Sequence, residues 1–506
     1  MTGRHGTLQG GTAILPPEQV ETTLAEVETP QEMRRAQPRP ARRFLRKKQT
    51  NPAPVTAPVE PSSAYITKGA KARPNLRRAR REGYFERAVA APSTTRQAEI
   101  LNPALIAAPT DDEGVVIGRD VLSNSAVAHD PFTAYRRKVI TSPSVCVLGV
   151  IGSGKSSLIK TVYVLRPIIL RGRRAVVMDK KDREGEGEYA ELTRQLGNEP
   201  FRFRLGGGGT IINPLDPLIC DVLGRPGQFG LLRAMAERAA GLDSLGTWQM
   251  KALRDAHVAV LRSSEQSGRA PLIEDLAREL GTVHDPHGRY SPQAAERMHQ
   301  AGLEVSFLFE GLMSDELGGL FDGPTSGHVQ LNEKLTTFDI SQLPEDGPAN
   351  ALVQVVAHAL VLGRLRGDRG KGTNFVSEEG WALVSGGVAR QMNANQMLAR
   401  GLGLSNIVAL HHVAQVGQDS DARSLLREPQ TVHIFRQDRA EDIDAVVSMY
   451  GLDAGSSAAL EHLEQGHHLL KIGRRAEIHV DHVRSPLEEQ LTETDSAMLI
   501  NKGRAA

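Results

Sequence analysis

Residues 149–156, which read GVIGSGKS, constrain the fold of this 506-residue chain more than any other segment. They match the pattern G-x-x-x-x-G-K-[ST], follow the apolar stretch 145–148 and precede the helical spacing of Leu158, Ile159 and Val162. A strand, a glycine-rich turn and a helix, in that order, form the context in which this pattern binds phosphate. The segment therefore predicts a P-loop at the end of a buried strand.

The chemistry of this loop predicts a nucleotide site for ATP and Mg²⁺. Glycines let the backbone curl so that successive N–H groups point at phosphate oxygens, and the helix that follows adds the positive end of its dipole. We expect Lys155 to neutralise charge on the β- and γ-phosphates, and the Ser156 hydroxyl to bind Mg²⁺. The residues predicted to bind the nucleotide are Gly149, Gly152, Ser153, Gly154, Lys155, Ser156 and Ser157.

A second acidic strand is needed for the metal and the attacking water, and residues 374–379 are the best candidate. This short apolar stretch ends in Glu378 and Glu379 and is followed by Gly380 and Trp381. We expect Glu378 to contact Mg²⁺ and Glu379 to act as the general base that orients or deprotonates water. An aspartate usually stands where Glu378 does, so the extra methylene could weaken activity. Asp339, at the end of another apolar stretch, is a rival.

Strand and helix patterns alternate through most of the chain. Apolar stretches at 145–148 and 175–178 are each followed by a helical pattern, which indicates a mostly parallel, doubly wound α/β sheet. Residues 228–320 lose the strand pattern and show helical spacing instead. The predicted segments are a disordered basic arm (1–99), a small β-rich lead-in (100–143), the first part of the P-loop core (144–227), a helical insertion (228–322), the second part of the core (323–490) and a C-terminal tail (491–506).

The net charge of +1 hides a strongly basic segment near the start. Residues 31–87 hold 16 Arg and Lys against four Glu, a balance of +12, and prolines interrupt them repeatedly. Such a segment buries too little apolar surface to offset the entropy of ordering. A solubilising tail and an arm that contacts acidic lipid, nucleic acid or an acidic partner are both open interpretations.

Composition excludes several classes of protein. No window of 18 or more uninterrupted apolar residues exists, so an integral membrane protein is not expected. The first ten residues do not form a secretory signal. Cys146 and Cys220 are too few for a disulfide framework or a four-cysteine zinc site, and we interpret both as core packing in a reducing cytoplasm.

Several segments, taken in order, resemble the TraC-like conjugation ATPases that energise type IV secretion systems, within the FtsK/HerA branch of P-loop proteins. The resemblance covers residues 114–495. It is carried by the P-loop and by VVMDK with Glu188 and Tyr189 (176–189), INPLD (212–216), LFDG (320–323), TFDIS (337–341), EEGW (378–381), LEQGHHLLKIG (463–473) and SPLE (485–488). It implies a RecA-like P-loop NTPase domain that hydrolyses ATP to ADP and phosphate.

The same resemblance directs attention to two further residues. The family commonly has a γ-phosphate-sensing glutamine after the strand that follows the acidic pair, whereas here residues 407–410 lead into His411 and His412. A histidine can donate a hydrogen bond to phosphate, so His412 is the expected substitute. These motors work as rings, usually hexamers, in which an arginine from a neighbour stabilises the transition state. Arg436 is favoured for that role over Arg427.

The resemblance implies a cytoplasmic ATP-driven motor that docks on a membrane-embedded secretion or conjugation complex, and peripheral attachment at the inner face of the membrane stays open. A soluble FtsK/HerA-like DNA translocase or coupling protein, with DNA as its partner, is the alternative. A catalytically silent ATP-binding scaffold is a further alternative, suggested by Glu378 and His412. Paired histidines at 467–468 and 479–482 fit ordinary strands better than a zinc site.

Overall fold

The computed structural model describes residues 114–492, apart from residues 243, 286, 315–316, 345–346, 369, 379–385, 415–422, 424–425 and 454. The predicted arm (1–99), the start of the lead-in (100–113) and most of the predicted tail (493–506) lie outside the described residues.

The described residues form one large, mostly parallel sheet of eleven strands. Its parallel part runs in the order β11-β3-β10-β9-β4-β8-β7, which puts β10 between the strand that leads into the P-loop and the strand that leads into Glu378. The parallel strands are β3 (Val145–Leu148), β4 (Arg174–Asp179), β7 (Phe201–Arg202), β8 (Leu335–Asp339), β9 (Thr373–Ser377), β10 (Leu404–Leu410) and β11 (Thr431–Ile434). Their carboxyl ends therefore meet at one edge.

Four antiparallel strands extend the sheet beyond β11. They are β12 (His467–Ile472), β13 (Ile478–His482), β1 (Val115–Asp120) and β2 (Ala126–His129). The predicted lead-in thus contributes the last two strands at one side of the main sheet, because β1 pairs with β13, more than 350 positions away in the sequence. A separate two-stranded hairpin joins β5 (Asp182–Arg183) to β6 (Glu186–Gly187).

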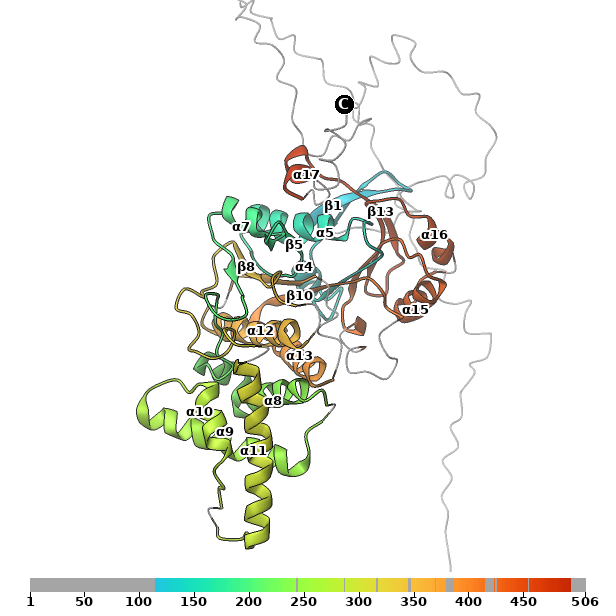
Figure 1. Ribbon diagram of the computed structural model, residues 1–506. Helices are drawn as coiled ribbons and strands as arrows, with labels where there is room; N and C mark the ends of the chain where they lie inside the picture. The colour runs from blue at the N-terminus through green and yellow to red at the C-terminus, as the bar shows by residue number, and fades with distance from the viewer. Residues whose placement is uncertain are drawn as a thin grey trace, which may run out of the picture. The chain divides into compact units, whose positions relative to one another are not determined.

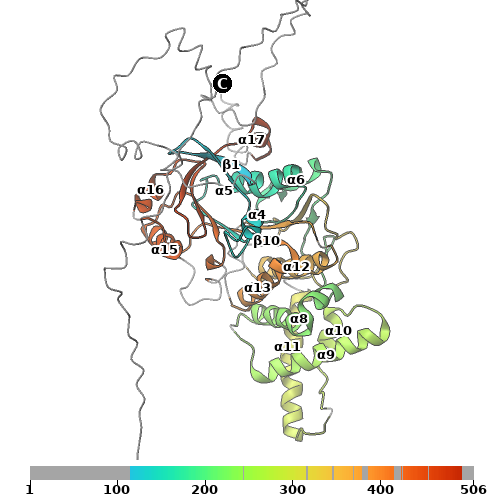
Figure 2. The same cartoon turned by 180° about the vertical axis from the view of Figure 1, so that it is seen from behind.

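Helices cover both faces of the sheet, as Figures 1 and 2 show. Alternation along β3 explains this, since Val145 and Val147 belong to one buried cluster while Cys146 and Leu148 belong to another. The helices on the side of Val145 are α5 (Lys155–Leu158), the π-helix η2 (Ile159–Leu165), α6 (Arg166–Arg171) and α7 (Ala190–Gln195). Those on the other side are α12 (Ala349–Gly367), α13 (Gly386–Ala399), α15 (Ala440–Tyr450) and α16 (Ser456–His462). Three shorter helical elements are α4 (Pro131–Arg136), η4 (Arg400–Leu402) and α17 (Pro486–Thr492).

Four helices between β7 and β8 form the insertion: α8 (Pro217–Ala239), α9 (Thr247–Ser267), α10 (Ile273–Leu280) and α11 (Pro292–Ser314). The INPLD segment explains where α8 begins, because Asp216 caps it by accepting a 3.0 Å hydrogen bond from Leu218 N. Buried Asn213 donates from Nδ2 to Pro271 O at 2.8 Å, which ties this start to the loop between α9 and α10. Helix α8 then packs against α12 and α13, while α9, α10 and α11 pack on one another (Figure 1).

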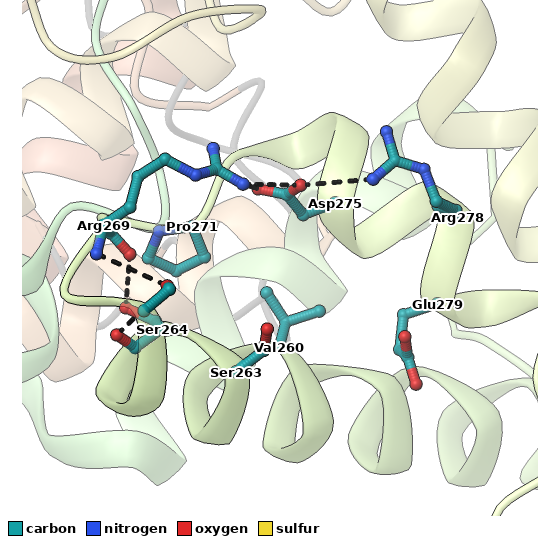
Figure 3. A pocket seen from close by; sticks show the side chains of 9 residues that line it. Val260, Ser263, Ser264, Arg269, Pro271, Asp275, Arg278 and Glu279 are labelled. Carbon is teal, nitrogen blue, oxygen red and sulfur yellow. Dashed lines mark hydrogen bonds and ion pairs between the residues drawn. The ribbon is translucent and has the colours of Figure 1, made fainter.

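A small groove lies between α9 and α10 in the insertion (Figure 3). Three of its four charged side chains are paired with one another, since Arg269 Nη2 lies 2.9 Å from both oxygens of Asp275, and Arg278 Nη1 lies 3.5 Å from Asp275 Oδ1. These pairs hold the loop that enters α10 against its first turn. The charged side chains Arg269, Asp275 and Arg278 in this groove are therefore explained by their role in holding the loop and the helix together.

Candidate nucleotide site

The P-loop joins β3 to the helical segment α5-η2-α6 at the carboxyl edge of the sheet. Gly149, Gly152 and Gly154 have φ values of 149°, 77° and 109°, which side chains rarely adopt. A Cβ at Gly149 would lie 2.6 Å from Phe435 Cβ, so close packing also requires glycine there. Ser153 donates from Oγ to Val150 O at 2.8 Å and thereby closes the turn.

The Lys155 side chain folds back over this turn. Its ammonium donates to Gly149 O at 2.6 Å and to Val150 O at 2.7 Å, and the residue is only 7% exposed. A buried cation at the centre of a turn of backbone N–H groups provides a positive potential for phosphate. Ser157, in the first turn of α5, accepts at its carbonyl from Thr161 Oγ1 at 2.8 Å, so its backbone is part of the helix.

The structure brings His411, rather than His412, to the P-loop lysine. Lys155 Nζ lies 3.0 Å from His411 Nδ1, whereas His412 Nδ1 lies 2.9 Å from Asp442 Oδ2 on α15. Burial and the Lys155 ammonium lower the pKa of His411 to about 4, so its ring is neutral at pH 7. Nδ1 also lies 3.3 Å from Gly149 O, but its shorter contact is with the ammonium, which can only donate, and this favours a ring in which Nδ1 accepts and Nε2 carries the proton. His411 is therefore a candidate for donating a hydrogen bond to phosphate, a role that the sequence analysis predicted for His412.

Glu378 follows β9 directly and reaches the P-loop serine. Ser156 donates from Oγ to Glu378 Oε2 at 3.0 Å, and the Tyr189 hydroxyl donates to Glu378 Oε1. Burial disfavours the charged carboxylate, but the Lys181 ammonium, the Tyr189 hydroxyl and the Lys160 ammonium together hold the pKa of Glu378 below its usual value. The extra methylene of glutamate, compared with aspartate, therefore still leaves the carboxylate in contact with the P-loop serine. Glu379, the predicted general base, lies outside the described residues, as does Trp381.

Two lysines and a second glutamate complete this site, and sequence reasoning gave them no role. Lys160 donates to Glu188 Oε1 at 2.6 Å inside the core, and Lys181 lies 3.6 Å from Glu188 Oε2. Lys181 also donates to Ser156 Oγ at 2.6 Å. The motif with Glu188 and Tyr189 carried part of the resemblance, but nothing in the sequence spacing joins those residues to Glu378.

Two further carboxylates lie behind this group, at the ends of neighbouring strands. Asp179 accepts from Tyr189 N at 2.6 Å, and Asp339 accepts from Gly187 N at 3.0 Å. Burial raises the pKa of Asp179 well above its usual value, and the charges of Glu188, Glu378 and Asp339 add to that effect. Asp339 also accepts from Ser341 N and Oγ, so its oxygens are already used by the protein. Glu378, which accepts from the hydroxyl of the P-loop residue Ser156, is therefore favoured over Asp339 as the ligand.

Arg436 lies beside the P-loop of its own chain. Its carbonyl accepts from Val150 N at 3.0 Å, while its guanidinium contacts Asp438 at 3.1 Å and is 44% exposed. Arg427 lies elsewhere, in a cleft beside Gln430 and Lys471 at the opposite edge of the sheet. The backbone of Arg436 therefore lies against the P-loop of its own chain.

The donor set at the loop fits Mg²⁺. A hydroxyl oxygen of Ser156 and a carboxylate oxygen of Glu378 lie 3.0 Å apart, with the Lys181 ammonium beside both. Mg²⁺ prefers oxygen ligands and keeps several waters, so two protein oxygens suffice when phosphates supply others. In the part of the chain that the structure describes, no group of three or more His, Cys, Asp or Glu side chains is arranged to hold a metal ion.

Comparison with known proteins adds information on the fold. No known family model and no curated protein matches the chain. Among solved structures, VirB4 of Thermoanaerobacter pseudethanolicus is 22% identical, with 75% of this chain and 99% of that chain covered at a TM-score of 0.61. This chain has the VirB4 fold. The predicted RecA-like P-loop NTPase architecture with a mostly parallel sheet is therefore confirmed.

Two other solved structures match less closely than VirB4. The plasmid coupling protein TrwB, in complex with a non-hydrolysable ATP analogue, is 14% identical, with 75% and 96% of the two chains covered and a TM-score of 0.47. The genome packaging NTPase B204 from Sulfolobus turreted icosahedral virus 2 is 9% identical, with 67% and 96% covered and a TM-score of 0.31. Among the described helices, none is both long and apolar enough to cross a membrane.

Proposed function

We propose that this chain is an ATP-hydrolysing motor that energises a conjugation or type IV secretion apparatus. The observation that carries the proposal is the order β3-β10-β9, which brings Lys155, His411 and Glu378 to one edge of a VirB4-like sheet. The edge where the carboxyl ends of parallel strands meet is where open α/β sheets bind ligands.

Each side chain has a distinct task in the proposed reaction. Lys155 neutralises phosphate charge, and Ser156 and Glu378 hold Mg²⁺, which supplies electrostatic stabilisation to the transferring phosphoryl group when bound. His411 donates from Nε2 to a phosphate oxygen, because its Nδ1 is occupied by Lys155. Glu379 orients or deprotonates the attacking water, as proposed from its place after Glu378.

Assembly and partners are part of the same proposal. A homo-hexameric ring, docked from the cytoplasm on a membrane-embedded complex, is the arrangement implied by the resemblance to conjugation ATPases. Arg436, whose guanidinium is exposed and whose backbone is held at the P-loop, is the arginine that we propose stabilises transition-state charge. His412, paired with Asp442, then serves to hold the end of β10 against α15.

Mg²⁺-dependent ATP hydrolysis by the full-length protein tests the proposal. We expect turnover from an oligomer that falls at least ~100-fold in Lys155→Ala and Glu379→Gln, because each removes a group acting on the transition state. Lys334→Ala is the matched control, since this exposed lysine precedes β8 at the opposite edge of the sheet. Stimulation by DNA would favour a translocase. ATP binding without turnover in every condition would leave a silent scaffold.

A further inference from the structure

The ammonium of Lys181 lies where the proposed metal ligands converge. Nζ is 2.6 Å from Ser156 Oγ and 3.4 Å from Glu378 Oε2, while those two oxygens are 3.0 Å from each other. The Ser156 hydroxyl therefore accepts from the ammonium and donates to the carboxylate. A positive group already bridges the two oxygens that would hold Mg²⁺.

We propose that Lys181 occupies the metal position in the nucleotide-free state and yields it to Mg²⁺ when the nucleotide binds. This inference rests on the proposed function. An ammonium and a divalent cation repel each other strongly at hydrogen-bonding distance, so both cannot bridge Ser156 and Glu378 at once. Lys181 thus acts as a positioning residue that keeps both oxygens in place until the metal arrives.

The surroundings of Lys181 suit a side chain that leaves its position. The side chain is 35% exposed, whereas that of Lys160, which contacts the other oxygen of Glu188, is 1% exposed. The backbone of Lys181 is held, because its carbonyl accepts from Glu188 N at 3.1 Å. Movement is therefore confined to the flexible four-carbon stem.

Lys160 keeps a positive charge beside the buried carboxylates during this exchange. It stays 2.6 Å from Glu188 Oε1 when Lys181 departs, so Glu188 is never left without a cation. Glu378 loses one positive neighbour and gains another of higher charge. The two lysines balance the two glutamates without the metal, and the departure of Lys181 limits the excess positive charge to +1 when the metal is bound.

Lys181→Met separates this role from a structural one, because it keeps the apolar stem and removes the charge. The assay is binding of a fluorescent ATP analogue to the full-length protein, titrated with Mg²⁺ and repeated in EDTA. We expect the Mg²⁺ concentration for half-maximal binding to fall about tenfold, since a charged hydrogen-bonding competitor is removed. In EDTA we expect binding to weaken, since the substitute cation is lost. Lys334→Met should change neither quantity.

The outcomes distinguish this inference from the proposed function. Wild-type protein that binds no nucleotide under any condition would overturn both. Binding with the same Mg²⁺ dependence in wild type and Lys181→Met, or a variant weakened equally with and without Mg²⁺, would overturn the exchange alone. Lys181→Gln, which keeps a donor without the charge, gives a second measure if the methionine variant folds poorly. Thermal melts of each variant establish that it is folded.

Discussion

Lys160→Met tests how the buried charges behind the P-loop are balanced. Lys160 Nζ lies 2.6 Å from Glu188 Oε1, and the two side chains are 1% and 4% exposed. Breaking such a pair leaves an uncompensated buried charge, at a cost of about 3–5 kcal/mol in the free energy of unfolding. Lys181 lies 3.6 Å from Glu188 Oε2 and compensates part of that charge. We therefore expect a loss of about 3 kcal/mol, at the lower end of the range.

A double-mutant cycle with Glu188→Gln isolates the pair. Removing both charges leaves neither one unpaired, so the double variant should lose about 2 kcal/mol less than the sum of the single variants. Urea unfolding followed by far-ultraviolet circular dichroism measures each free energy. Arg225→Met removes a partner of the exposed Glu265, and should change the free energy of unfolding by less than about 0.5 kcal/mol. The reasoning would be refuted if the losses in free energy of unfolding of the two single variants added up to that of the double variant. It would also be refuted if Lys160→Met lost no more than Arg225→Met.

Three further predictions concern other parts of the fold. Gly149→Ala should abolish tight nucleotide binding in an equilibrium titration, because its Cβ would lie 2.6 Å from a neighbouring side chain at a φ of 149°. Burial lowers the pKa of His358 to about 4, so its stabilising contribution is present above the unfolded pKa near 6.5 and is lost as pH falls. That loss is about 1.4 kcal/mol at roughly pH 5.5. The free energy of unfolding should therefore depend less steeply on pH between about 4 and 6.5 in His358→Gln, but not in the exposed His287→Gln. Arg166→Lys cannot reproduce the two hydrogen bonds to Glu488 at 2.7 and 2.9 Å, so it should speed hydrogen exchange in α17 while leaving α11 unchanged.

The local part of the site could be predicted from the sequence. A P-loop is read from consecutive residues, and its backbone curl follows from glycines at fixed spacing, so the positions of Lys155 and Ser156 were predictable. The parallel sheet was predictable for the same reason, since apolar stretches alternate with helical patterns along the chain. Both inferences need only short-range information.

Contacts between distant segments could not be predicted in the same way. Whether His411 or His412 faces the P-loop depends on where β10 ends, because adjacent side chains of an extended segment point in opposite directions. Likewise, β1 joins the main sheet by pairing with β13, which comes from the far end of the chain. Lys181 reaches Ser156 through the turn after β4, which no periodicity in the sequence indicates.

Glu378 shows how distant contacts decide the meaning of a local departure. Taken alone, a glutamate in place of aspartate suggests a carboxylate displaced from the position in which it would contact Mg²⁺. In the folded chain the extra length is used, since one oxygen accepts from Ser156 and the other from the buried hydroxyl of Tyr189. A shorter side chain would leave at least one of these donors without its acceptor, and an unsatisfied buried donor is costly. The glutamate and Tyr189 are therefore best understood as one unit, which argues for a working metal site rather than a silent one.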